Sequence, residues 1–332
     1  MRKFILFFIL GGVLVISGCE NVLLSNERVE SPETLAVELP GWPKRISPSG
    51  DYTFSTPTVG NIDNDPQYEV LVMKSGSGPV TELYAWHANG SGVTNYDGFF
   101  ADIDTHYVYP PTLGDLDGDG DDEIVISSQN GVKIFQGDGS LRIIRNGINH
   151  DSIVRPVLAD INSDGFLDII SSVNTNNKIY IYDKFGNYLP GWEGGQSNIL
   201  LNYDGISSIA IGDLDNNGYP EIVVVAARYY GNVNEYIGIL IFSHNGSLRG
   251  EYKKMEILNP LESPHVAIGK LDSSNNSKIA FYYKDNTRTF FGVISDKANL
   301  IKEWSIMSQG GNEVAEQGYW LSLGNLDRDS EV

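Results

Sequence analysis

Short apolar runs separated by turn residues recur along the chain, and they predict β-strands. Two examples are Ser207-Ser-Ile-Ala-Ile-Gly212 and Glu221-Ile-Val-Val-Val-Ala226. Both are rich in β-branched residues, which is typical of strands. No long segment repeats its apolar residues with the 3.6-residue period of a helix. The pattern therefore predicts an all-β protein.

A second pattern predicts a hairpin at a fixed place in each repeat. An aromatic residue is followed four positions later by a glycine, in the pairs Trp86/Gly90, Phe135/Gly139, Tyr182/Gly186 and Phe242/Gly246. Three of these turns contain Asn-Gly or Asp-Gly, which tolerate positive φ. A connector, Leu39-Pro-Gly-Trp42, also recurs as Leu189-Pro-Gly-Trp192. The chain is therefore an array of similar units.

Acidic loops between the strands share one spacing of oxygen-bearing residues. Carboxylates or amides fall at loop positions 1, 3, 5 and 9, and an apolar strand follows. Counting the residue at position 7 as well, the three good copies contain Asp115, Asp117, Asp119, Asp121 and Glu123; Asp160, Asn162, Asp164, Phe166 and Asp168; and Asp213, Asp215, Asn217, Tyr219 and Glu221. A looser copy contains Asn61, Asp63, Asp65, Gln67 and Glu69. These residues are the candidate metal ligands.

This spacing predicts calcium sites, because Ca²⁺ takes about six to eight oxygen ligands and a tight loop turns alternate side chains inward. Positions 1, 3 and 5 would supply side-chain oxygens, position 7 a backbone carbonyl, and position 9 a carboxylate that binds through both oxygens. The last acid follows the glycine by three residues instead of the six of an EF-hand, and strands flank the loop, so these are not EF-hands. We expect three to four Ca²⁺ ions. Mg²⁺ is less suited because it demands octahedral geometry and retains its waters.

The other copies are weaker. Pro66 replaces the glycine of the Asn61 loop, and a fifth copy has lysine at positions 1 and 9, Lys270 and Lys278. We expect no metal in that copy: either a lysine ammonium takes the place of the cation, or the loop has degenerated. The alternative for all the loops is a solvated turn held by Asx hydrogen bonds. Clustered carboxylates repel one another without a cation, which favours metal binding.

The distance between loops predicts the architecture. The copies, including a last one that begins at Asn325, start 45 to 57 residues apart. Such a period accommodates four short strands, the size of a propeller blade. We therefore expect a β-propeller of four-stranded blades over residues 39–332, with about six visible repeats. The last copy is interrupted at Val332, so we expect a truncated C-terminal end.

At these residues the chain resembles the VCBS/FG-GAP repeats, in which Asp-x-Asp-x-Asp-Gly-x-x-Glu/Asp joins two strands at blade-length spacing. Those repeats build calcium-bearing propellers that include the head of integrin α-chains. The resemblance implies calcium in the loops, seven blades in a complete ring, and a role in binding or adhesion. The literal Phe-Gly and Gly-Ala-Pro signatures are absent; Pro110-Pro-Thr-Leu-Gly114 and Arg155-Pro-Val-Leu-Ala159 stand near the place of the latter. Integrin-like ligand binding therefore does not follow from the resemblance.

Charge narrows the class of partner. The formal net charge is -20, and the four loops hold fifteen of the 43 acidic residues. The acidity is thus concentrated where a cation would neutralise it. It argues against nucleic acid as a partner, since binding to phosphate needs a basic surface.

The N-terminus has the pattern of an export signal. Arg2 and Lys3 precede an apolar run of thirteen residues, which is too short for an ordinary membrane-spanning helix. Ile16-Ser-Gly-Cys19 then resembles the lipobox of bacterial lipoproteins, which implies cleavage after residue 18 and lipidation of Cys19. The alternative is an ordinary signal peptide that contains a cysteine. We expect an exported protein anchored by lipid to the cell envelope, with residues 19–38 as a polar tether.

The sequence favours a binding module over an enzyme. His-Glu-x-x-His and a phosphate-binding glycine loop are both absent. The histidines are expected to serve local packing or to be exposed: His87 and His244 in hairpins, and His106, His150 and His265 before loop strands. We therefore expect a surface-anchored calcium-binding module for protein or polysaccharide. The alternative is a calcium-dependent carbohydrate-active enzyme such as a polysaccharide lyase.

Overall fold

The computed structural model describes residues 53–307, except for 76–79, 95–96, 146–147, 151–153, 174–176, 196–202, 204, 229–235, 256–261, 273 and 285–287, together with Gly41, Trp42, Lys44 and Ile46. The predicted signal peptide, Cys19, the tether and the Asn325 copy lie outside this part of the chain. Within it the structure contains nineteen strands and no helix, as the apolar pattern predicts. The described residues accordingly offer no helix with the length and hydropathy of a membrane span.

The strands form five antiparallel sheets, each made of strands that are consecutive in the chain, and we call these sheets the first to fifth blades. The first contains β1 (Thr58–Gly60), β2 (Glu69–Ser75), β3 (Thr81–His87) and β4 (Phe99–Ile103). The second contains β5 (Thr112–Gly114), β6 (Glu123–Ser128), β7 (Gly131–Phe135) and β8 (Leu141–Ile144). The third contains β9 (Val157–Ala159), β10 (Asp168–Val173) and β11 (Lys178–Tyr182). The fourth contains β12 (Gly205–Gly212), β13 (Glu221–Arg228), β14 (Tyr236–Phe242) and β15 (Leu248–Met255), and the fifth β16 (Glu262–Gly269), β17 (Lys278–Lys284), β18 (Arg288–Ile294) and β19 (Leu300–Met307).

Four blades have the four strands that the repeat length predicts, and the third has three among the described residues. Tyr188 pairs with Tyr182 there as an isolated bridge. In the fourth blade, the equivalent pair, Phe242 and Leu248, begins the fourth strand. The third blade therefore keeps the start of the same pattern.

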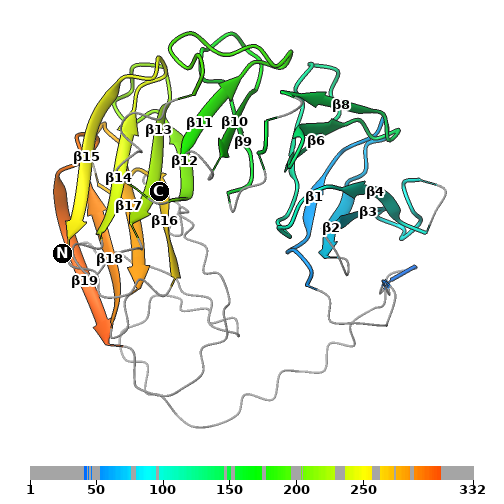
Figure 1. Ribbon diagram of the computed structural model, residues 1–332, viewed down its shortest axis with the longest axis horizontal. Coiled ribbons are helices and arrows are strands. Elements are labelled where there is room, and N and C mark those ends of the chain that lie inside the picture. The colour runs from blue at the N-terminus through cyan, green and yellow to red at the C-terminus, as the bar shows by residue number, and fades with distance from the viewer. Residues whose placement is uncertain are drawn as a thin grey trace.

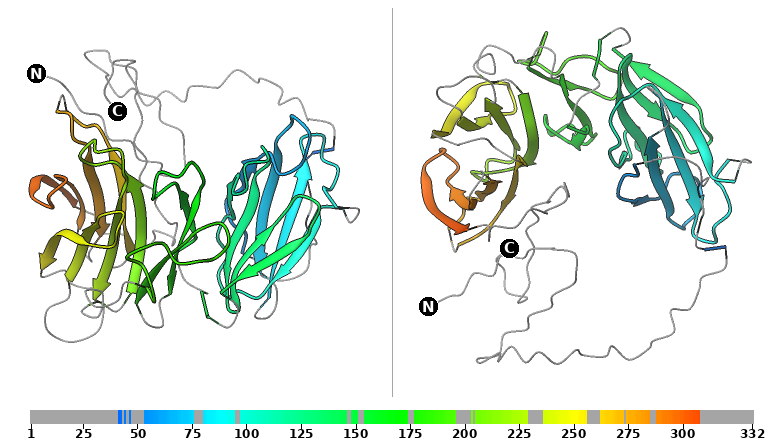
Figure 2. Two further views of the ribbon diagram at one scale, coloured as in Figure 1. Left: turned by 90° about the horizontal axis from the view of Figure 1, so that it is seen from above. Right: turned by 60° about the horizontal axis from the view of Figure 1, so that its bottom comes forward.

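The blades follow one another along an arc in chain order (Figure 1). Contacts between neighbouring blades include those that join the first strands, β1 to β5, β5 to β9, β9 to β12 and β12 to β16. The views in Figure 2 show the sheets as separate layers along this arc. This radial arrangement of four-stranded meanders is that of a β-propeller.

The hydrophobic core lies between the blades. Leu71 and Met73 of the first blade, for example, pack in one cluster with Ile124 and Ile126 of the second. Similar clusters join the second blade to the third, the third to the fourth and the fourth to the fifth. Because a blade buries both faces, its middle strands are apolar without alternation, as in β13, where all but the last residue are buried.

The predicted hairpins are present. The turn glycines Gly90, Gly139, Gly186 and Gly246 have φ between 80° and 86° and donate their N–H to the carbonyl three residues earlier. Such a φ is accessible to glycine at little cost, which explains the fixed aromatic-to-glycine spacing. In the fifth blade Ala298 takes this position with φ 60°.

The duplicated connector fastens the same turn in two blades. Trp192 is buried, and its Nε1 donates to the carbonyl of His244 at 2.8 Å. Trp42 Nε1 donates to the carbonyl of Ala88 at 2.9 Å. His244 and Ala88 each lie two residues after the aromatic residue of the hairpin motif, so the two connectors make the same contact.

Small residues at the end of the first strands allow the blades to approach closely. A Cβ atom added to Gly114 would lie 2.9 Å from Leu158 Cδ1 and 2.8 Å from Leu167 Cδ1 in the third blade. A Cβ atom added to Gly60 would similarly meet Leu113 of the second blade at 2.5 Å. Glycine at these positions therefore sets the spacing between blades.

Gly114→Val should lower the free energy of unfolding by about 1–3 kcal/mol, because the added methyls overpack the contact with Leu158 and Leu167. Gly205→Val is the matched control, since a Cβ at this strand residue would meet none of the described residues within 4 Å. Denaturant midpoints of both variants measure the effect. Equal losses in the two variants would contradict the close-packing explanation.

Candidate metal sites

The acidic loops are held at one place in every blade by strand register. Each loop joins the first strand of a blade to the second, and position 9 is the first residue of that second strand. Glu69, Glu123, Asp168 and Glu221 each pair with the residue just before position 1. Lys278 takes the same register position in the fifth blade. The sheet therefore fixes the backbone of position 9 relative to the start of the loop.

The acid at position 9 closes the loop through a buried hydrogen bond. One of its oxygens accepts the backbone N–H of position 2, over 2.6 to 3.1 Å, in the pairs Ile62/Glu69, Leu116/Glu123, Ile161/Asp168 and Leu214/Glu221. The apolar side chains at position 2 are buried, and so are the four acids. The predicted ligands at position 9 are thus anchored carboxylates with one oxygen in use.

The carboxylate at position 1 organises the turn in the three good loops. One oxygen of Asp115, Asp160 and Asp213 accepts the N–H of the glycine at position 6, over 2.9 to 3.1 Å. Those glycines have φ between 88° and 100°. The loop therefore needs glycine at position 6, both for its φ and for its N–H.

Positions 3 and 5 form Asx-type hydrogen bonds, as the solvated-turn alternative expects. Asp117 Oδ1 accepts the N–H of Asp119 at 3.3 Å, and Asp119 Oδ1 accepts that of Asp121 at 3.0 Å. In the third blade Asp164 Oδ1 accepts the N–H of Phe166 at 2.9 Å. The other oxygens of Asp117 and Asp164 accept side-chain amide hydrogens, from Gln136 Nε2 at 3.4 Å and from Asn162 Nδ2 at 3.0 Å.

Clusters of carboxylates result in the second and fourth blades. Single ligand atoms of Asp115, Asp117 and Glu123 lie within 4.8 Å of one another, and so do those of Asp213, Asp215 and Glu221. The third loop has an asparagine at position 3, and Asn162 Nδ2 donates to Asp164 Oδ2 at 3.0 Å. Predicted ligands from positions 1, 3 and 9 are therefore brought together in two of the three good loops.

Electrostatics at position 9 favour a positive charge. Burial, with a smaller contribution from repulsion by Asp117, Asp119 and Asp115, raises the pKa of Glu123 to about 7. Burial also raises the pKa of Asp168 to about 7, with Asp164 and Asp160 adding to the shift. Glu123 Oε1 is buried and has no hydrogen-bond partner among the described residues. The donor set thus fits a divalent cation.

The middle of the chain matches a known repeat. Residues 115–171 and 160–224 match the sequence model of the FG-GAP-like repeat. This part of the chain is similar to FG-GAP-like repeats. It runs from the acidic loop of the second blade to β13 of the fourth and includes the three loops that have glycine at position 6.

Several solved structures are similar to this chain at low sequence identity. The V. cholerae biofilm matrix protein Bap1 is 17% identical with a TM-score of 0.55, and the match covers 80% of this chain and 42% of that one. The exotype rhamnogalacturonan lyase YesX is 14% identical with a TM-score of 0.41, over 78% of this chain and 58% of that one. The C-terminal domain of Pseudomonas aeruginosa PilY1 is 11% identical with a TM-score of 0.40, over 73% and 70%. This chain thus matches less than half the length of Bap1, and no curated protein matches it.

In the fifth loop a lysine ammonium lies among the oxygen atoms of the loop. Lys278 Nζ at position 9 donates to Ser274 Oγ at 2.6 Å and to the carbonyl of Asn276 at 2.7 Å, and it lies 3.4 Å from Asp272 Oδ1. These partners occupy positions 5, 7 and 3. Of the two outcomes expected for this loop, the ammonium in the place of the cation is the one observed.

The fourth loop receives an arginine from another strand of its own repeat. Arg249 of β15 pairs through Nη2 with Asp215 at 2.8 Å and through Nη1 with Glu221. Sequence reasoning missed this contact. Ser247-Leu-Arg249 repeats Ser140-Leu-Arg142, a duplication that could have drawn attention to Arg249.

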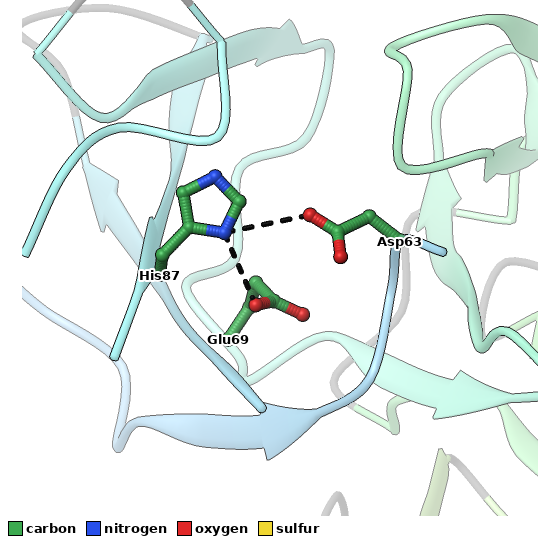
Figure 3. Close-up of side chains that lie close together, drawn as sticks. All are labelled: Asp63, Glu69 and His87. Carbon is green, nitrogen blue, oxygen red and sulfur yellow. Dashed lines mark hydrogen bonds and ion pairs between the residues drawn. The ribbon is translucent and has the colours of Figure 1, made fainter. Parts of the chain in front are cut away.

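The first loop also departs from the FG-GAP-like pattern. His87, which ends β3, places Nδ1 3.2 Å from Glu69 Oε1 and 3.4 Å from Asp63 Oδ2 (Figure 3). Burial raises the pKa of Glu69, whereas hydrogen bonds from Ile62 and His87 lower it. The expectation that His87 serves only local packing or is exposed misses this cluster, because its partners lie 18 and 24 residues away in sequence.

The other histidines have the local roles expected of them. His150 is buried between Ser171 Oγ, at 3.0 Å, and the hydroxyl of Tyr182, at 3.3 Å, and burial lowers its pKa to about 4. Burial also lowers the pKa of His265 to about 4. His244 stacks on Tyr219, with ring centroids 4.4 Å apart. His106 contacts the side-chain amide of Gln129.

The metal-free protein should lose stability as pH rises from about 4.5 to about 7. The folded chain holds protons on Glu123 and Asp168 that the unfolded chain releases near pH 4. Because the folded state then binds more protons, its free energy of unfolding falls with rising pH. Melting temperatures of protein dialysed free of metal, measured across this range, check the slope.

Glu123→Gln should remove part of that slope and make the metal-free protein more stable than the parent at pH 8, since the amide still accepts the Leu116 N–H. The exposed Glu193→Gln serves as the control and should follow the parent. A parent protein whose stability rises through this window would contradict the assignment.

Proposed function

We propose that this β-propeller is an exported, lipid-anchored binding or adhesion module whose blades are braced by calcium and whose ligand is a protein or a polysaccharide. The observation that supports calcium binding is the position of the lysine in the fifth loop. There the same loop frame holds a cationic group with positions 3, 5 and 7. In the loops that have an acid at position 9 in place of this lysine, the same frame offers additional oxygen atoms and has no ammonium charge.

In the second blade the ion would be held by Asp115, Asp117, Asp119, the carbonyl of Asp121, and Glu123. The equivalent residues of the third blade are Asp160, Asn162, Asp164, the carbonyl of Phe166, and Asp168, and those of the fourth are Asp213, Asp215, Asn217, the carbonyl of Tyr219, and Glu221. Such oxygen-only sets suit Ca²⁺. In the fourth blade calcium must displace Arg249, so we expect this site to be the weakest of the three. The ion supplies charge neutralisation and a brace for the hairpin.

Exposed aromatic rings at the loop tips support a ligand surface at this end of the blades. Phe166 and Tyr219, both at position 7, are 41% and 40% exposed, and Tyr68 at position 8 of the first loop is 64% exposed. Since position 7 would give its carbonyl to the ion, an ordered loop also orders the ring that it carries. Such rings suit stacking on sugars or contact with a protein.

The anchor rests on the sequence of the N-terminus. The apolar run followed by Ile16-Ser-Gly-Cys19 supports export and acylation of Cys19. Residues 19–38 would then separate the propeller from the membrane. Several acyl chains would hold the protein firmly, at about 0.8 kcal/mol for each buried CH₂.

Calcium should raise the melting temperature reversibly, and excess chelator should lower it. Each site adds about 2.7 kcal/mol at a calcium concentration of 100 times its Kd. Asp117→Ala should remove one equivalent of calcium in titration calorimetry. Asp272→Ala is the matched control, because it changes the same loop position where Lys278 stands, and it should remove none. If the protein shows neither a thermal shift nor calcium by elemental analysis, the proposal of calcium binding is contradicted.

Phe166→Ala and Tyr219→Ala should each weaken binding to the ligand found on glycan or protein arrays by about tenfold, the loss expected for one stacked ring. Trp304→Ala is the control, since Trp304 is similarly exposed, at 42%, but lies on β19. Turnover of pectin-type polymers by the purified protein would overturn the binding module in favour of an enzyme.

A further inference from the structure

The first loop cannot reproduce the calcium frame of its neighbours. Pro66 at position 6 has no N–H to donate to position 1, and proline cannot adopt the positive φ of the other loops. With the side-chain amide of Asn61 at position 1 turned so that its nitrogen faces inward, that nitrogen donates to the carbonyls of Asp63, Asp65 and Gln67 over 2.9, 2.8 and 3.0 Å. The position 7 carbonyl is thereby used inside the loop.

An imidazole nitrogen takes part in this loop. Nδ1 of His87 faces Glu69 Oε1 and Asp63 Oδ2, and the three side chains converge from the loop, β2 and β3 (Figure 3). The other oxygens are already in use: Glu69 Oε2 accepts the Ile62 N–H at 3.1 Å, and Asp63 Oδ1 accepts the Asp65 N–H at 3.2 Å. Each carboxylate is thus held so that one oxygen remains for a shared partner.

The spacing of these atoms matches the coordination shell of a small divalent ion. Nitrogen and oxygen ligands on a tetrahedral Zn²⁺, at about 2.0–2.1 Å from the metal, lie about 3.3 Å apart. The two His87 distances are 3.2 and 3.4 Å, and all three ligand atoms lie within 4.8 Å of one another. Metal binding therefore needs little movement of the side chains.

We propose that Asp63, Glu69 and His87 form a site for a borderline transition-metal ion, of which Zn²⁺ is the representative, and that this site is distinct from the calcium loops. Imidazole suits Zn²⁺ and its neighbours in the first transition row, whereas Ca²⁺ takes oxygen. Three protein ligands leave a fourth position for water or for an oxygen of a bound ligand. His87 and Asp63 side chains are 25% exposed, so that position is accessible.

The competing possibility is that His87 carries a proton and itself serves as the cation, as Lys278 does in the fifth loop. A bound metal ion and a protonated His87 cannot be distinguished by charge alone. They differ in metal stoichiometry and in the electronic spectrum of a substituted metal, so the stoichiometry and the spectrum must both be measured.

The test is titration of the full chain with Zn²⁺ in millimolar Ca²⁺, which fills the oxygen-only loops, against a chromophoric chelator. We expect one equivalent of Zn²⁺. Co²⁺ in its place should give the visible absorption of a four-coordinate ion with nitrogen and oxygen ligands. Calcium is titrated separately without zinc, so the calcium proposal and this one fail independently.

His87→Gln should weaken Zn²⁺ binding at least tenfold and abolish the Co²⁺ spectrum. The fold should tolerate it, because Gln136 occupies the equivalent hairpin position of the second blade, with Nε2 3.4 Å from Asp117 Oδ2. His244→Ala, which removes a different hairpin histidine, is the control and should bind as the parent does.

The proposal is overturned if the parent binds no Zn²⁺ in excess calcium, or if His87→Gln binds it as tightly as the parent. Protons on both ring nitrogens of His87 that persist at pH 8 with equimolar Zn²⁺, seen by NMR, would likewise assign the imidazolium as the cation.

Discussion

The hydrogen bond from the backbone N–H of position 2 to the carboxylate at position 9 is the contact on which four of the five blades depend. It joins the start of the loop to the start of the second strand, and strand register fixes both ends. It also requires a carboxylate in the interior, where an uncompensated charge is costly. The rest of the loop is explained by the need to offset that charge.

The positive group in the loop differs from blade to blade, but it lies at the same place in each loop. Arg249 reaches the fourth loop from β15, and Lys278 the fifth loop from position 9 itself. In the second and third blades the proposed divalent ion has this role, and in the first blade the proposed transition-metal ion beside His87 has it. A frame that accepts a guanidinium, an ammonium or a metal ion selects for positive charge first and for coordination chemistry second.

Much of this architecture is predictable from the sequence, because its signals are local. The loop spacing, the hairpin glycines and the apolar second strands each lie within about ten residues, so the blades follow from pattern alone, whereas for the Lys270 loop the pattern leaves two outcomes open. The duplicated Pro-Gly-Trp connector is visible too, although its contact with the next hairpin is not. His87 and Arg249 were missed for one physical reason. Hairpin pairing brings them to loops 18 to 36 residues earlier in the chain, and sequence spacing does not show which strand face they occupy.

The glycine contacts between the first strands bear on the angle between neighbouring blades. Adjacent blades approach closely near the axis because Gly60 and Gly114 have no Cβ atom. A larger residue at either position would hold the two inner strands apart while the outer strands stayed in contact. The angle between those two blades would then change. The curvature of the arc in Figure 1, and hence the number of blades that would complete a circle, is therefore encoded at single residues beside the acidic loops.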